Sequence, residues 1–364
     1  MGRSLRGRFS GVVRYTDQLA RAVGSVLGDD LTVFLTRAPD GLGDLGVRRV
    51  RAPFPTPNEY ARAFWEQTIV PIEVARIRPD VYHSPNYILP LAIACPTVVT
   101  IHDMFYRNSS LHRRRSHLYL SVLADMAIRK ATRVICVSAF TRDRLLERFP
   151  DASDRVRVVG EGVDSSFRPP SHLAIEGLRE RLGLSDPYVL FVGTIEPRKN
   201  LARLIKAFER AVTRSGVRHH LVIAGASGWK DRPVMAALEA SGLRDRIHMV
   251  GYLAEEDLPT AYGAADVFAY PSEGEGFGLP PLEAMACGTA VLTSNSTSLP
   301  EVVGDAALLV DPRDEVDLAE GLERMMCDPE ERERRSQLGL RRAAQFSWAR
   351  VAAQTMAVYA EAIA

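Results

Sequence analysis

The chain has 364 residues, of which 46% are hydrophobic and 25% charged, and its formal net charge at pH 7 is +1. This length suits two domains that each bury a hydrophobic core, and the small net charge excludes an electrostatic field strong enough to hold nucleic acid. The four cysteines form no CxxC pair, no metal-ligand spacing occurs, and no stretch reaches membrane-spanning length, so we expect free thiols and a cytoplasmic location.

Short apolar runs alternate with amphipathic helical patterns in the first half of the chain. The predicted strands are residues 31–35, 81–83, 97–101, 133–137 and 156–159. The predicted helices between them are residues 12–27, 66–77 and 118–131. Alternation of this kind is typical of a parallel sheet that helices cover on both faces.

The same alternation restarts after Arg168-Pro169-Pro170. Strands are predicted at residues 188–192, 220–224, 246–250, 267–270 and 290–293, and helices at residues 201–214, 280–287 and 348–363. The pattern therefore predicts an α/β protein in which a linker within residues 164–187 joins two domains. Open parallel sheets bind ligands beyond the carboxyl ends of their strands, and two such domains facing each other would hold a ligand in the cleft between them.

A glycine-rich loop, residues 273–278, leads into the predicted helix 280–287. Pro280 suits the first turn of this helix because its missing N–H would be unpaired there, and Gly288 suits the C-terminal cap. Free N–H groups and the helix dipole favour an anion at such a start. Glu275 and Glu283 flank it, so the anion should belong to a larger ligand whose hydroxyl groups need acceptors. A nucleotide-diphospho sugar is such a ligand.

Two cations precede the helix predicted at residues 201–214. Arg198 and Lys199 follow the preceding strand, and Asn200 is placed to cap the helix. Cations at this position can meet a diphosphate, and the alternative is a solvated pair at a helix start. No Asp-x-Asp sequence occurs, so we expect fixed cations, and no metal ion, to stabilise a departing diphosphate.

The carboxylates of the glycine-rich loop also carry a resemblance to a known family. Glu275 and Glu283 enclose seven residues, and the segment resembles the glutamate–seven–glutamate signature of retaining glycosyltransferases of family four. Segments that resemble family segments in the same order lie at residues 10–15, 100–103, 137–141 and 191–200. The resemblance implies the GT-B fold, with two Rossmann-like domains facing a central cleft, and is nearest to bacterial polysaccharide mannosyltransferases.

The resemblance also assigns the domains. Residues 1–168 would form the acceptor-side domain, residues 169–345 would bind the nucleotide sugar, and residues 346–364 would return to the first domain. A final helix that caps the second domain is the alternative. Family members begin with an apolar strand before the first glycine loop, whereas this chain reaches that loop almost at once. We therefore expect the first strand of the N-terminal domain to be missing, through a truncated start.

The resemblance implies roles for single residues. Glu283 would accept hydrogen bonds from the ribose hydroxyls, and Glu275 would contact the transferred sugar. His102 would lie beside that sugar, with a structural histidine beside an aspartate as the alternative. The implied catalytic residues are His102, Lys199 and Glu275. The implied donor-binding residues are Gly11, Arg198, Lys199, Tyr252, Leu253, Glu275, Gly276, Phe277, Gly278, Leu279 and Glu283.

On the acceptor side, His83 is expected in a shaped loop. A basic and aromatic cluster suits either an anionic lipid-linked acceptor at a membrane surface or a solvated helix face. Its members are Tyr106, Arg107, Leu111, Arg113, Arg114, Arg115 and Tyr119.

We therefore expect a retaining, metal-independent glycosyltransferase that needs no cofactor. Its donor would be a GDP- or UDP-linked hexose, with mannose preferred, and its acceptor a hydroxyl of a glycan, a lipid-linked sugar or a natural product. We do not expect nucleic acid as a partner. We expect peripheral contact with the inner face of the membrane. The alternatives are a nucleotide-sugar epimerase of the same fold, which would form free epimer from donor alone, and a non-catalytic subunit, which would bind donor tightly without turnover.

Overall fold

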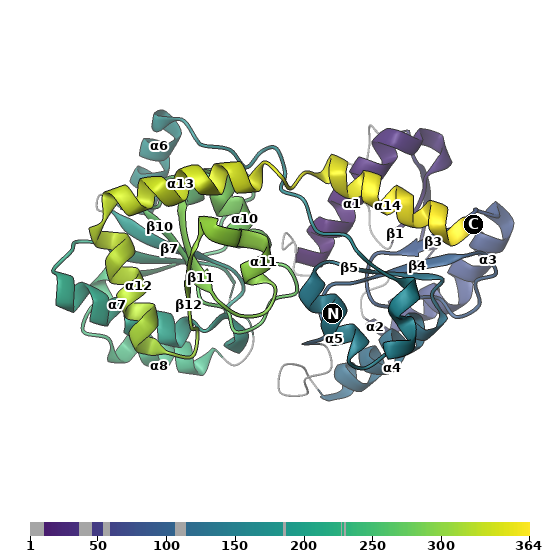
Figure 1. Ribbon diagram of the computed structural model, residues 1–364, viewed down its shortest axis with the longest axis horizontal. Coiled ribbons are helices and arrows are strands. Elements are labelled where there is room, and N and C mark those ends of the chain that lie inside the picture. The colour runs from purple at the N-terminus through teal and green to yellow at the C-terminus, as the bar shows by residue number, and fades with distance from the viewer. Residues whose placement is uncertain are drawn as a thin grey trace. The chain divides into compact units, whose positions relative to one another are not determined.

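The computed structural model describes residues 11–35, 46–53, 59–105, 114–184, 187–226, 228 and 231–364. The chain divides into two compact units (Figure 1): unit 1 is Met1–Gly162 with Ser347–Ala364, and unit 2 is Val163–Phe346. The first division precedes the expected one after residue 168. Within unit 2, Val163 donates a backbone hydrogen bond to the Phe346 carbonyl (3.1 Å), and the ring of Phe167 lies 6.0 Å from that of Tyr262.

Unit 1 contains parallel strands and the helices that cover them. Its strands are β1 (Thr32–Leu35), β2 (Arg48–Arg51), β3 (Tyr82–Ser84), β4 (Thr97–Ile101), β5 (Arg133–Cys136) and β6 (Val156–Val158). Its helices are α1 (Gly11–Leu27), α2 (Glu59–Phe64), α3 (Val70–Ile77), α4 (Arg114–Lys130), α5 (Ala139–Leu146) and α14 (Trp348–Ile363).

The helix predicted at residues 66–77 differs in form from the structure. The helical segment begins earlier, and a π-helical turn, Trp65–Ile69, separates α2 from α3. Pro71 lies in the first turn of α3 and has no N–H to donate to the carbonyl of Gln67. A wider turn at this point is therefore the expected local adjustment.

Every strand pair of unit 1 is parallel, as predicted. The described strands form two separate ladders, β1–β2 and β3–β4–β5–β6. The ladders meet through side chains, because the rings of Phe34 and Tyr82 lie 6.1 Å apart. Strand β2 has no counterpart among the predicted strands, because its three arginines are exposed and leave no apolar run.

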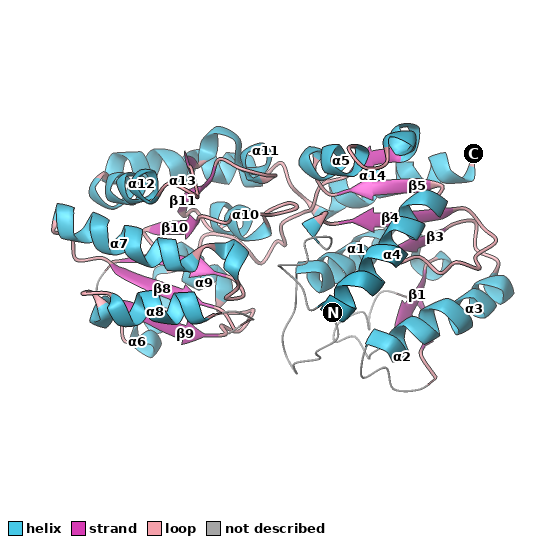
Figure 2. Ribbon diagram, turned by 90° about the horizontal axis from the view of Figure 1, so that it is seen from below, coloured by secondary structure: helices cyan, strands magenta, loops and turns pink. Residues whose placement is uncertain are grey.

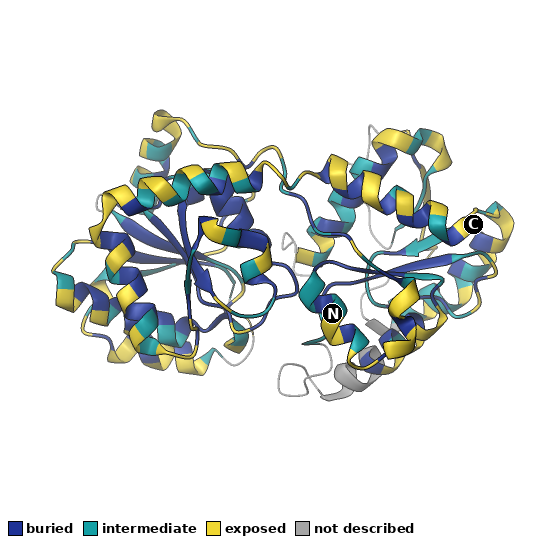
Figure 3. Ribbon diagram, in the orientation of Figure 1, coloured by how far each residue is buried: buried dark blue, intermediate teal, exposed yellow. Residues whose placement is uncertain are grey.

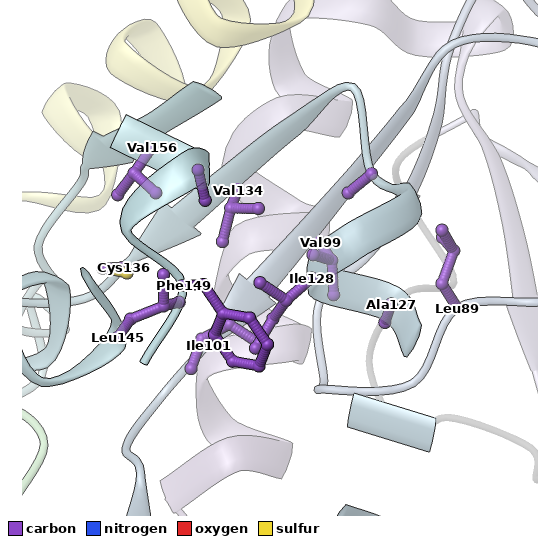
Figure 4. Packing of buried hydrophobic residues seen from close by; sticks show 12 residues of the cluster. Leu89, Val99, Ile101, Ala127, Ile128, Val134, Cys136, Leu145, Phe149 and Val156 are labelled. Carbon is purple, nitrogen blue, oxygen red and sulfur yellow. The ribbon is translucent and has the colours of Figure 1, made fainter. Parts of the chain in front are cut away.

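A dry core holds β4 and β5 against α4 and α5 (Figure 4). Phe149, which follows α5, is only 1% exposed within this cluster. The other members shown and labelled are Leu89, Val99, Ile101, Ala127, Ile128, Val134, Cys136, Leu145 and Val156. This packing fixes the strand β4, whose carboxyl end leads directly into His102.

The last helix, α14, returns to unit 1, where it packs against α1, β4 and β5. Ser347 caps its start by accepting a hydrogen bond from the backbone N–H of Arg350 (3.2 Å). One face of the helix is apolar and buried, with Trp348, Val351 and Val358 among its residues. The alternative in which this helix caps the second domain is therefore wrong.

Unit 2 has the same alternation of strands and helices. Its strands are β7 (Tyr188–Val192), β8 (His220–Ala224), β9 (Ile247–Gly251), β10 (Val267–Tyr270), β11 (Ala290–Ser294) and β12 (Leu308–Val310). Its helices are α6 (His172–Leu182), α7 (Leu201–Ser215), α8 (Arg232–Ala240), α9 (Leu258–Gly263), α10 (Leu279–Ala286), α11 (Leu299–Val303), α12 (Glu315–Cys327) and α13 (Pro329–Ala343). The predicted linker is wrong in part, because α6 lies inside it and packs on α9.

The described strands of unit 2 form one parallel sheet in the order β12-β11-β10-β7-β8-β9. Helix α7 packs against α8 and α12, whereas α10 packs against α9 and α13, and Figure 2 shows the strands between helices. The strands are largely buried, as their dark blue colour in Figure 3 indicates. In the described part of both units, no helix combines the length and the apolar character needed to cross a lipid bilayer.

The chain passes between the units after Gly162 and after Phe346, and the close packing of these two places predicts the effect of a substitution. A Cβ built on Gly162 would lie 2.6 Å from the backbone nitrogen of Trp348, closer than any real contact. We expect Gly162→Ala to lower the free energy of unfolding by about 1–3 kcal/mol, because a backbone atom must move to admit the methyl group. Urea titration followed by circular dichroism measures this change.

Gly177→Ala is the matched control. Gly177 lies inside α6, and a Cβ there would meet nothing within 4 Å. Alanine favours a helix interior over glycine by roughly 0.5–1 kcal/mol, so this variant should be more stable than the parent. If Gly162→Ala is as stable as Gly177→Ala, the close approach at Trp348 is wrong.

Candidate active site

The order in which the chain adds strands to the sheet of unit 2 reverses between β7 and β10. From β7 the chain proceeds outward to β9, then returns to the other side of β7 and proceeds outward through β10 to β12. The loops after β7 and β10 therefore leave the sheet side by side at its carboxyl edge, where open α/β sheets bind their ligands. Two hydrogen bonds to the Arg198 carbonyl join these loops, one from the Glu273 N–H (2.8 Å) and one from the Ser272 hydroxyl (3.0 Å).

One carboxylate at this edge binds two cations. Lys199 Nζ donates to Glu275 Oε1 (2.6 Å), and Arg198 Nη1 donates to Glu275 Oε2 (2.7 Å). The hydroxyls of Ser272 (2.6 Å) and Tyr270 (3.0 Å) also contact Oε1. Lys199 and Glu275 are only 6% and 8% exposed. The alternative of a solvated arginine–lysine pair is therefore wrong for Lys199.

The charges of this cluster shift one another's pKa values. Burial raises the pKa of Glu275, but the neighbouring Arg198 and Lys199 outweigh burial and lower it to about 2. Burial, and then Arg198, lower the pKa of Lys199, while Glu275 opposes them. Arg198 also pairs with Glu196 (2.6 Å), so two cations and two carboxylates balance. An anionic ligand that binds these cations would compete with Glu275 for them.

Asn200 occupies the residue before α7 but does not cap it as predicted. Its backbone is left-handed (φ +61°), and its side chain makes no capping hydrogen bond to the helix. The side-chain amide instead donates to the Pro312 carbonyl (2.6 Å), and its oxygen accepts from Arg203 (2.7 Å). These bonds hold the turn that carries Lys199 against the loop after β12.

Helix α10 (Leu279–Ala286) begins and ends one residue before the predicted helix 280–287, and the expected glycines flank it. Gly278 precedes it with φ +118°, and a Cβ there would lie 2.7 Å from the Leu299 side chain. Gly288 follows it with φ +79° and donates to the Met285 carbonyl (3.0 Å). Glu283 lies beyond the first turn, is 3% exposed and accepts a hydrogen bond from the Tyr262 hydroxyl (2.9 Å). A carboxylate that only stabilises its own helix start does not fit this position.

The remaining donor-binding candidates of unit 2 lie in two places. Gly276 and Phe277 continue the loop from Glu275 to α10, and Phe277 is buried with its ring 6.0 Å from that of Phe346. Tyr252 is 45% exposed and Leu253 is buried directly after β9. Because β9 is the edge strand, two places from β7, this pair is not part of the ion cluster.

In unit 1, both ring nitrogens of His102 have partners. Nε2 contacts the Pro85 carbonyl oxygen (2.8 Å), which can only accept, so Nε2 carries a proton. Nδ1 faces Glu161 Oε1 (3.4 Å), and both residues are 6% exposed. The neighbouring Asp103 accepts from Phe105 N–H instead (2.9 Å). The alternative of a structural histidine beside an aspartate is therefore wrong about the partner of His102, which is Glu161. A sugar hydroxyl could reach this ring only by replacing one of its present contacts.

Glu161 is the residue that sequence reasoning missed here. It lies three residues after β6, between Gly160 and Gly162. A carboxylate between two glycines at the carboxyl end of a strand is a usable signal, because ligand sites gather at that edge. Gly11 is the first residue of α1, and no described atom lies within 4 Å of a Cβ built on it.

The expectation for His83 is wrong. It lies in β3, as the strand predicted at residues 81–83 implies, and bridges Tyr359 Oη (2.7 Å) and Thr100 Oγ1 (2.8 Å), so it is a half-buried strand residue that ties α14 to the sheet. Burial, and then the nearby His102, lower the pKa of His83 to about 3. Tyr106, Arg107, Leu111 and Arg113, and the side chains of Arg114, Arg115 and Tyr119, lie outside the described residues.

Two family descriptions match the chain, "Glycosyltransferase Family 4" over residues 9–167 and "Glycosyl transferases group 1" over residues 176–342. The chain is 35% identical over 281 residues to O-antigen chain mannosyltransferase B of Escherichia coli, which covers 77% of this chain and 74% of that protein. It is 30% identical over 321 residues to serotype-specific mannosyltransferase WbdA of Escherichia coli. That match covers 81% of this chain, which spans only 38% of the relative's length.

Among solved structures, Alr3699/HepE of Anabaena in complex with UDP and glucose is similar, with a TM-score of 0.74 and 20% identity. The match covers 96% of each chain. The fold shared with such structures is GT-B, with a Rossmann-like arrangement in each unit.

The ion cluster predicts how stability depends on pH. The pKa of Glu275 falls from an ordinary 4.5 to about 2 in the folded protein, so its contribution is present above pH 4.5 and is lost as the pH falls toward 2. Glu275→Gln leaves two cations short of a buried partner, and we expect a loss of about 3 kcal/mol at pH 7 that shrinks as the pH approaches 2. Denaturant unfolding at several pH values measures this difference.

Glu273→Gln is the control, because the Glu273 side chain is 38% exposed in its ion pair with Arg203. We expect it to change stability by less than about 0.5 kcal/mol over the same range. A Glu275→Gln variant with the same pH profile as this control would contradict the proposed balance of charges.

Proposed function

The chain belongs to glycosyltransferase family 4, and from this premise we propose that it moves a hexose from a nucleotide-diphospho sugar to a hydroxyl acceptor, with retention of configuration and without a metal ion. The enzyme is a glycosyltransferase. The observation that carries the finer proposal is the meeting of Lys199 and Arg198 on Glu275 at the switch point between β7 and β10.

The demanding step in such a transfer is the departure of the diphosphate, which develops negative charge. Lys199 and Arg198 are fixed donors beside the N-terminal end of α10, where free backbone N–H groups favour an anion. Their partial burial strengthens the attraction, because the effective dielectric constant falls away from water. Fixed cations of this kind would do the work that a divalent metal does in other transferases.

Retention requires that the acceptor approach the anomeric carbon from the same face of the sugar ring from which the diphosphate departs. The acceptor oxygen forms a bond to the anomeric carbon as the bond from that carbon to the diphosphate oxygen breaks, and the departing phosphate oxygen takes the acceptor's proton. No side chain is assigned as general base. Glu275 would contact the transferred sugar, and His102 would lie beside it.

We assign the nucleoside to Glu283. This carboxylate is buried and accepts from Tyr262, and a carboxylate is an acceptor for hydroxyl groups such as those of a ribose. Tyr252 and Leu253 would receive the base near β9. Gly11 and the loop from Gly276 to Leu279 would supply backbone N–H groups to the diphosphate and sugar.

Mannose from a GDP donor is the proposed sugar, and a growing glycan or lipid-linked sugar at the inner membrane face is the proposed acceptor. Two relatives named as mannosyltransferases support the sugar, and the name of one of them, O-antigen chain mannosyltransferase B, supports the polysaccharide. Because a similar solved structure holds UDP and glucose, a UDP donor is the competing choice. A panel of donors decides between them.

A thermal-shift panel of UDP, GDP, ADP and their sugars tests donor binding. A ligand that binds only the folded state raises the melting temperature, and we expect one nucleoside diphosphate to do so. Glu283→Ala should abolish that rise, since the ribose loses its acceptor. The neighbouring loop variant Glu273→Ala should retain it, and an equal rise in both variants would reject the assignment of Glu283.

Lys199→Ala tests turnover. Removing one preorganised cation should lower kcat for sugar transfer by about 100-fold or more, whereas Lys206→Ala, an exposed lysine on α7, should leave it unchanged. Transfer is measured as sugar incorporated into acceptor. A Lys199→Ala enzyme that folds and transfers sugar at the parent rate would contradict the proposed role of Lys199. Free epimer formed from donor alone would favour the epimerase instead.

A further inference from the structure

Thr297 has a backbone conformation that its side chain disfavours. Its φ is +59°, in the left-handed region. Among the described residues other than glycine with positive φ (Arg78, Tyr87, Asn200 and Thr297), Thr297 alone is β-branched. A β-branched residue in this region is a true outlier, and such strain persists only where the surrounding structure imposes it.

The surroundings of Thr297 are a row of hydroxyl groups that hold the loop after β10. Thr293 donates to the Tyr270 carbonyl (2.8 Å), and Ser294 donates to the Ser272 carbonyl (2.6 Å). Ser298 donates to the carbonyls of Glu275 (3.0 Å) and Phe277 (2.8 Å). Residues 293–298 therefore bond the loop at intervals from the end of β10 almost to the start of α10.

Thr297 has a separate role in this row. Its Oγ1 accepts a hydrogen bond from the backbone N–H of Glu275 (3.3 Å), whereas the other three hydroxyls donate to carbonyls. Together, Thr297 and Ser298 bind both the N–H and the C=O of Glu275. The left-handed backbone at Thr297 lets the hydroxyls of two consecutive residues reach the backbone of the same residue, Glu275. These two hydrogen bonds can hold Thr297 in its strained conformation.

We propose that Thr297 is a positioning residue for transfer: its strained backbone holds the hydroxyl that fixes Glu275 opposite Lys199 and Arg198. The inference rests on the proposed function, because it deepens the role of Glu275 in that reaction. Thr297 itself need not touch the substrate. If the backbone N–H of Glu275 lost its partner, the carboxylate would sample positions away from the sugar, so kcat would fall more than the donor KM would rise.

Three substitutions separate the hydroxyl from the strain. Thr297→Ser keeps the hydroxyl, Thr297→Val keeps the shape and the strain but loses the hydroxyl, and Thr297→Gly loses both. We expect kcat to fall about tenfold in the Val and Gly variants, as loss of one positioning hydrogen bond implies, and to stay within about threefold of the parent in the Ser variant. Donor KM should change by less than about threefold in all three.

Two further readouts do not depend on kcat. The Gly variant should melt about 2 °C or more above the Val variant, since they differ in strain and both lack the hydroxyl. Hydrogen exchange, read by mass spectrometry on a peptide that covers Glu275, should be faster in the Val variant than in the parent. Ser296→Ala is the control, because the Ser296 hydroxyl has no partner in the described part of the chain and its loss should change neither kcat nor the exchange rate.

The proposal is overturned if Thr297→Val keeps the parent kcat and the parent exchange rate, or if the Gly variant melts at or below the Val variant. A parent enzyme that transfers no sugar from any donor would reject the proposed function instead. Exchange at Glu275 and the order of melting temperatures would then still decide whether Thr297 holds this loop.

Discussion

A carboxylate can stay charged inside a protein only where cations or hydrogen-bond donors surround it, and the site in unit 2 depends on this condition at Glu275. Lys199 and Arg198 supply the cations from the loop after β7. Tyr270, the last residue of β10, and Ser272, in the loop after it, supply hydroxyls. The pairing ties together the two segments that meet at the switch point of the sheet. It also balances the charges of the two cations.

Much of the fold follows from the sequence, because buried parallel strands produce short apolar runs that need no knowledge of tertiary contacts. β4, β7, β8 and β10 lie at their predicted residues. Strand β2 and helix α6, which the pattern misses, lack this signal. The exposed arginines of β2 do not resemble a buried strand, and α6 buries mainly Leu178, which leaves little apolar periodicity in the segment taken for a linker.

The candidate site could be predicted only where a local motif carries the chemistry. The spacing of Glu275 and Glu283 and the position of Lys199 before α7 are visible in the sequence. Contacts between distant segments are not, so the contact of Glu161 with His102 and that of Thr297 with Glu275 emerge only from the structure, although the glycines around Glu161 are a signal in the sequence. The capping role predicted for Asn200 failed for the same reason, because the Pro312 carbonyl competes for its side chain.

The proposed exchange of Glu275 for a diphosphate can be measured most directly by calorimetry on a quadruple variant, Glu196→Gln with Arg198→Met, Lys199→Met and Glu275→Gln, which removes both cations together with the two carboxylates that they bind. The nucleoside diphosphate that stabilises the parent enzyme and its nucleoside are titrated into both proteins. Because each charge-assisted hydrogen bond contributes about 1.5–3 kcal/mol, we expect the Kd of the diphosphate to rise at least about 100-fold and that of the nucleoside to stay within about threefold. A quadruple variant that binds the diphosphate with the parent Kd would contradict the assignment of this cluster as the donor site.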